Sequence, residues 1–84
     1  SRGEPFIVWT ERGANRIEGE VAPRSATVRA TVKRKELKVR RPAANRWQIE
    51  LSREINLEDI EITAQHGASR AILRLRESPY SHTK

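Results

Sequence analysis

The chain has 84 residues, of which 36% are hydrophobic and 33% are charged, and its formal net charge at pH 7 is +6. This length fits one domain with a single thin core. The absence of cysteine excludes a disulfide framework and thiolate metal sites, and no apolar run approaches the roughly 18 residues that a membrane-spanning helix needs.

The N-terminal quarter of the chain predicts a linker followed by two strands. Residues 1–5 read as a linker that ends at a proline, and residues 6–10 form a short run of aromatic and β-branched residues typical of a strand. A polar turn at 11–15 leads to a second predicted strand at 16–22. Gly19 occupies an inward position of that strand, which indicates a bulge or the close approach of another backbone.

The middle of the chain, Ala26 to Leu51, has the clearest pattern, because apolar and polar residues alternate along most of it. Period-two alternation places every second side chain in one core and leaves the other face in water. The predicted strands are 26–32, 36–41 and 46–51, joined by turns at 33–35 and 42–45.

The pattern lapses after Leu51 and then returns for two more strands. A crossover at 52–57, a strand at 58–65, a turn at 66–69, a strand at 70–76 and a polar tail at 78–84 are predicted in that order. Gly67 supplies positive φ to the turn. Seven short strands with turn signals between them predict an all-β sandwich or small barrel over residues 6–77.

Four stretches resemble the bacterial immunoglobulin-like (Big-type) domain. The pattern Ile17-x-Gly19-x-Val21-x-Pro23, followed by Ala-Thr-Val at 26–28, is similar to the opening of that domain. Trp-x-Ile-x-Leu at 47–51 and Asp-Ile-Glu-Ile-Thr-Ala at 59–64 are similar to two of its later strands, and 70–76 fits its final strand. The resemblance implies a seven-stranded immunoglobulin-like β-sandwich with Greek-key order, from a modular bacterial surface or secreted protein.

Two turns depart from that family. Residues 42–46 replace its usual acidic, glycine-containing turn, and residues 65–69 replace its Asp-x-Ala-Gly-Asn turn. An inter-module calcium site is therefore not expected. The resemblance implies a non-catalytic structural or adhesive module, which is extracellular or in the cell envelope, joined to neighbouring modules and monomeric in isolation.

The positive charge is concentrated in residues 24–46, which hold nine Lys or Arg and only one acidic residue, Glu36. A localised basic surface favours an anionic partner, such as an acidic polysaccharide, teichoic acid or nucleic acid, held by counterion release. The alternative is a solvated face whose charges protect an edge strand from pairing. The predicted contact residues, from a hairpin ribbon and its turn, are Arg29, Lys33, Arg34, Lys35, Lys38 and Arg40.

No catalytic, cofactor-binding or metal-binding set emerges from the remaining residues. The densest acidic cluster, Glu58, Asp59 and Glu61, could hold a cation. No glycine-containing calcium loop accompanies it, so the better interpretation is a set of solvated carboxylates that balance the charge of the basic strands. His66 and His82 are expected at the surface, in a turn and in the tail. An enzyme is therefore not expected.

Two tryptophans and the strand pairing separate the remaining hypotheses. Trp47 is in phase with core residues, whereas Trp9 could be core or exposed for stacking on sugars or bases. The second hypothesis is a cytoplasmic SH3-like or OB-like barrel that binds nucleic acid through the same basic strands, and a third is a mechanical spacer. A sandwich pairs its strands in two separate sheets, whereas a barrel closes one bent sheet.

Overall fold

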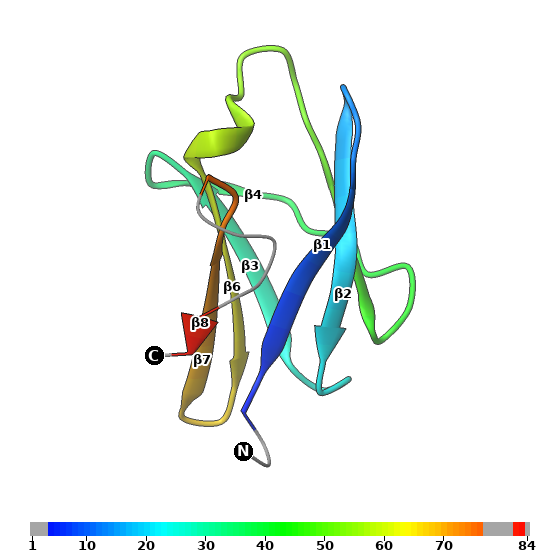
Figure 1. The fold of residues 1–84 in the computed structure, drawn as a ribbon, viewed down its shortest axis with the longest axis vertical. Coiled ribbons are helices and arrows are strands. Elements are labelled where there is room, and N and C mark those ends of the chain that lie inside the picture. Colours follow the sequence, from blue (N-terminus) through cyan, green and yellow to red (C-terminus); the bar gives the residue numbers. More distant parts are fainter. Residues whose placement is uncertain (1–3, 77–81, 84) are drawn as a thin grey trace.

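A computed structural model describes residues 4–76 and the backbone of residues 82–83 (Figure 1). The described elements are β1 (Phe6–Arg12), β2 (Arg16–Ala22), β3 (Thr27–Val32), β4 (Lys35–Leu37), β5 (Arg46–Glu50), η1 (Leu57–Asp59), β6 (Ile60–His66), β7 (Ser69–Arg74) and β8 (His82–Thr83). η1 is a single 3₁₀ turn, so the described chain is all-β, as the alternation predicts.

The strands form two separate antiparallel sheets. One has the order β1-β2-β5, and the other has the order β4-β3-β6-β7-β8. Figure 1 shows the two sheets facing one another, with the chain passing between them after β2, after β4 and after β5. Two sheets, and not one closed sheet, agree with the pairing expected of a sandwich.

The core lies between the two sheets and is built from the side chains that alternation points inward. The largest fully buried side chains are Trp47, Ile7, Ile17, Ile49, Ile60, Ile62 and Leu73. Val28, Val32, Leu37, Val39 and Leu51, also predicted inward, are partly buried against this cluster. Trp9 packs against the cluster as well, so the core interpretation of this residue is the better one, while Phe6 remains 45% exposed.

Gly19 has the close backbone approach that its inward position predicts. It lies opposite Trp9 on β1 and opposite Trp47 on β5. A β-carbon at Gly19 would come within 2.7 Å of the Trp9 Cα and 2.8 Å of the Trp47 Cζ2, and nearer still to the Val8 carbonyl oxygen. The register of β1 shifts just beyond this point, between Trp9 and Glu11.

The predicted strand at 36–41 is wrong in its pairing. β4 ends at Leu37, and Arg40 then pairs with Gln48 on the other sheet through two backbone hydrogen bonds of 2.8 and 2.9 Å. Leu37 and Val39 both pack on the core, so alternation continues while the chain changes sheets. Alternation reports which side chains are buried, but it does not report which strand is the neighbour.

The C-terminal strands differ from the prediction in smaller ways. β6 begins at Ile60, because the preceding residues form η1, which Asn56 caps by accepting a 3.0 Å hydrogen bond from the Glu58 backbone N–H. Gly67 has φ +61° in the predicted turn. Ile72 points away from the main core but is only 8% exposed, so it is buried on the outer face of its sheet.

The two ends of the domain lie partly outside the described residues. Of the predicted linker at 1–5, Pro5 is buried and Glu4 is exposed. Of the predicted tail at 78–84, only the backbone of residues 82–83 is described, and it forms β8 against Ala71 and Ile72. The described residues therefore form eight strands, where seven were expected.

Candidate anion-binding hairpin

Within the basic segment 24–46, β3 and β4 form a tight hairpin. Val32 pairs with Lys35, so Lys33 and Arg34 alone make the turn. Their φ angles are +50° and +72°, the pattern of a type I′ turn. Such positions favour Asn and Gly, because a β-carbon at positive φ approaches the following carbonyl oxygen. The predicted turn at 33–35 is thus one residue shorter than expected.

Five of the six predicted contact residues lie on or next to this hairpin. Lys33, Arg34 and Lys35 form its tip, Arg29 points outward from β3, and Lys38 follows the end of β4. Lys35 is in phase with the inward Leu37, although its own side chain is exposed at the rim. These five residues are called the basic hairpin below.

Arg40 is not part of the basic hairpin. Its backbone pairs with Gln48, so it belongs to the edge of the sheet formed by β1, β2 and β5. There its guanidinium is 3.5 Å from the Glu50 carboxylate. The expectation of one continuous basic surface that includes Arg40 is therefore wrong, because the chain stops pairing with β3 at the end of β4 and crosses to the other sheet before it reaches this residue.

Two cations of the basic hairpin have carboxylate partners. Arg29 holds Glu36 through two contacts of 3.2 Å, from Nε and from Nη2. Lys33 Nζ lies 3.9 Å from Asp59. For the three others, Arg34, Lys35 and Lys38, no ion pair is formed among the described residues.

Arg41 has a structural role that sequence reasoning missed. Its guanidinium is half-buried and donates to four backbone carbonyls, from Nε to Arg46 (3.0 Å), from Nη1 to Ala26 (2.9 Å), and from Nη2 to Arg24 (3.4 Å) and Ala44. It therefore ties the loop before β3 to the loop before β5. In a run of basic residues, the sequence does not distinguish an arginine that binds backbone carbonyls from one that is exposed to solvent.

Asp59 and Glu61, two of the three acidic residues at 58–61, form ion pairs with basic side chains. Asp59 lies 3.5 Å from Arg76 in addition to Lys33, and Glu61 accepts a 3.0 Å hydrogen bond from Arg74 Nε. Within residues 4–76 there is no group of three or more His, Asp or Glu side chains placed to hold a metal ion. His66 is half-buried at the end of β6, and the His82 side chain lies outside the description.

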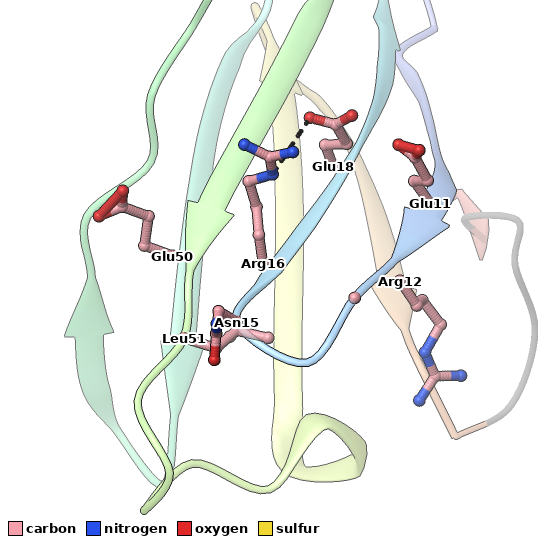
Figure 2. Close-up of a pocket in the computed structure, with 8 residues that line it drawn as sticks. Glu11, Arg12, Asn15, Arg16, Glu18, Glu50 and Leu51 are labelled. Carbon is pink, nitrogen blue, oxygen red and sulfur yellow. Dashed lines mark ion pairs between the residues drawn. The ribbon is translucent and has the colours of Figure 1, made fainter.

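A shallow depression of about 670 Å³ lies on the outer face of the three-stranded sheet, near the turn between β1 and β2. Figure 2 shows Glu11 and Glu18 side by side on neighbouring strands, with Arg16 between Glu18 and Glu50. Period-two alternation places Arg16, Glu18 and Glu50 outward, whereas Glu11 reaches this face through the register shift between Trp9 and Glu11. The alternation does not indicate the depression. Acidic and basic side chains both line it.

Glu18 is the centre of that charge network. It accepts a 2.9 Å hydrogen bond from Gln48 Nε2 and lies 3.7 Å from Arg16 and 3.9 Å from Arg46. The Gln48 hydrogen bond and the charges of the two arginines lower the pKa of Glu18. Its carboxylate is thus kept ionised and well satisfied, which suits a structural role better than proton transfer.

Comparison of the chain with protein-family models, with curated proteins and with solved structures found no match. In the described part of the chain, no helix is long and apolar enough to cross a membrane. The case for function therefore depends on the fold and on the basic hairpin.

Proposed function

We propose that the chain is a non-catalytic immunoglobulin-like β-sandwich module that contacts an anionic partner through the tip of the basic hairpin. The observation that carries the proposal is that Arg34, Lys35 and Lys38 are exposed on one hairpin without an ion pair among the described residues. A surface kept for solubility alone would not need three uncompensated charges on one hairpin.

The strand order supports the immunoglobulin-like part of the proposal. Sheets β1-β2-β5 and β4-β3-β6-β7 contain the first seven strands, and the chain passes between them after β2, after β4 and after β5, which supports the expected Greek-key order. One difference from constant-type immunoglobulin domains is that β4 pairs with β3 and not with β5. The separation into two sheets also argues against the SH3-like or OB-like barrel.

The backbone of the turn supports a functional charge at the tip. Holding a non-glycine residue in the left-handed region costs roughly 1–2 kcal/mol, and Lys33 and Arg34 are both there. Asn-Gly would make the same turn at lower cost. Strain retained at an exposed site is the kind of observation from which a functional hypothesis follows.

The mechanism is charge complementarity with counterion release. A linear polyanion that contacts Arg34, Lys35 and Lys38 displaces condensed cations from three of its charges. For duplex DNA the logarithm of the binding constant then falls with the logarithm of salt concentration with a slope of about −2.7. An acidic polysaccharide or a teichoic acid would give its own slope by the same mechanism.

A salt series of binding to duplex DNA, teichoic acid, an acidic polysaccharide and anionic vesicles tests the proposal. The variant R34Q/K35Q/K38Q should lose the salt-dependent binding. The matched control R24Q/R53Q/R70Q removes three exposed arginines that also lack an ion pair among the described residues, and it should bind as the parent does. Equal losses in both variants, or no binding by the parent, would leave the module as a spacer.

The resemblance to bacterial immunoglobulin-like domains supports a cell-surface or secreted origin and neighbouring modules as further partners. The fold itself is compatible with any compartment, so this part of the proposal depends on the resemblance. Localisation of the protein with an antibody, before and after permeabilising the cells, distinguishes a surface module from a cytoplasmic nucleic-acid-binding protein.

A further inference from the structure

Glu36 is the only acidic residue in the basic segment, and it is placed against the cations of the hairpin. It lies opposite Thr31 on the outer face, in the middle of the three-residue β4. A carboxylate at this position lies between the tip and Lys38. A polyanion running along the hairpin would pass over it.

The contact between Glu36 and Arg29 uses the guanidinium as a fork. Nε reaches one carboxylate oxygen and Nη2 reaches the other, both at 3.2 Å. The two side chains are 69% and 59% exposed, so the pair is open to water and to any competing anion. Exposed ion pairs of this kind are weak and screened by salt.

Asp59 acts on Lys33 at the tip in the same way. It lies 3.9 Å from Lys33 Nζ and 3.5 Å from Arg76, and its side chain is only 27% exposed. η1 therefore presents a fixed carboxylate to the turn, whereas the Lys33 side chain is 80% exposed and free to move toward a ligand.

We infer that Glu36 and Asp59 are intramolecular competitors for the anionic partner and set how many cations of the basic hairpin that partner contacts. With both carboxylates in place, the site offers Arg34, Lys35 and Lys38 to the polyanion. Without Glu36, the polymer gains Arg29 and follows the hairpin over its whole length. The inference rests on the proposed function, because it concerns the same site.

The test compares E36Q and D59N with the parent in a salt series with duplex DNA as the probe. E36Q frees one cation, Arg29, so the slope of the log–log plot should steepen by about 0.9, with roughly eightfold tighter binding at 0.1 M salt. D59N frees Lys33 and also Arg76, so its slope should steepen by about 0.9 if the DNA reaches Lys33 alone and by about 1.8 if it reaches both. Adding R29Q to E36Q should restore the parental slope, because the freed cation is then absent.

Two controls separate local release from a change in net charge. E58Q removes one negative charge next to Asp59, from a side chain that forms no ion pair within residues 4–76. E50Q frees Arg40 on the other sheet. Neither should steepen the slope.

The outcomes distinguish the two proposals. If the parent binds and E36Q and D59N behave as E58Q does, the competition is refuted and the proposed function stands. If neither the parent nor any variant shows salt-dependent binding, the proposed function itself fails. Urea unfolding of each variant at the same pH excludes loss of the fold as the cause.

Discussion

Gly19 and Trp47 lie directly opposite one another on β2 and β5, and the missing side chain of the glycine provides the space that the indole ring occupies. The Trp47 ring is fully buried, and its Nε1 donates a 3.1 Å hydrogen bond to the Glu20 carbonyl oxygen. The largest residue of the core is therefore accommodated by the smallest residue of the neighbouring strand.

Replacing Gly19 with alanine should destabilise the domain by about 3 kcal/mol or more, because the new methyl group would meet backbone atoms that have no room to move. Urea unfolding followed by tryptophan fluorescence measures the change. Gly13→Ala is the matched control, since its β-carbon would lie 3.4 Å from the nearest atom, the Arg16 carbonyl oxygen. Equal effects at the two positions would contradict the steric explanation.

Replacing Arg41 with lysine should cost about 2–3 kcal/mol of stability. One ammonium group cannot reach the four carbonyls that the planar guanidinium joins, and hydrogen bonds to charged groups are the stronger class. The control is Arg40→Lys, which alters an exposed ion pair of 3.5 Å and should change the unfolding free energy by less than about 1 kcal/mol. A small effect of both substitutions would show that the Arg41 hydrogen bonds are replaced by water at little cost.

Residues 38–41 show how far the sequence predicts this fold. Alternation identifies the residues of the main core from β2 to β7, though not the buried outer-face residue Ile72, because burial of one face is a local property of each strand. It fails at residues 38–41, where the chain changes sheets while Val39 stays against the core. Which strand an extended segment pairs with is decided by distant residues such as Gln48, which no local pattern contains.

The same limit applies to the candidate site. The excess of Lys and Arg in residues 24–46 predicts a basic hairpin, and Arg34, Lys35 and Lys38 do lie on one. Asp59 is distant from Lys33 in the sequence. A local sequence pattern therefore could not predict that these two residues form an ion pair. Arg29 pairs with Glu36 only because the turn is two residues long, which sets the register of β3 against β4.

Stability should decline on acidification partly through Glu18. Folding lowers its pKa, so its contribution is complete above the ordinary carboxyl value of 4.5 and is lost as the pH falls through the lower folded-state value. Glu18→Gln should therefore be less stable than the parent at pH 7, and the difference should shrink at pH 3. Unfolding free energies of both proteins at the two pH values measure this.

Glu54 provides the control for that experiment. Its side chain is exposed and forms no ion pair among the described residues. Glu54→Gln should match the parent at both pH values. A constant deficit of Glu18→Gln from pH 7 to pH 3 would mean that the loss comes from packing and not from the ionised carboxylate.

Replacing Arg34 with glycine should separate stability from binding. Glycine adopts φ +72° without the penalty of a β-carbon, so the variant should be about 1 kcal/mol more stable than the parent. Gly67→Ala is the reciprocal control: it introduces a β-carbon at φ +61° where nothing lies within 4 Å, and it should cost about the same amount. If the tip binds a polyanion, Arg34→Gly should also flatten the salt dependence with duplex DNA by about 0.9. A more stable protein that binds less well would show that the turn residue is retained for its charge, whereas unchanged binding would remove Arg34 from the site.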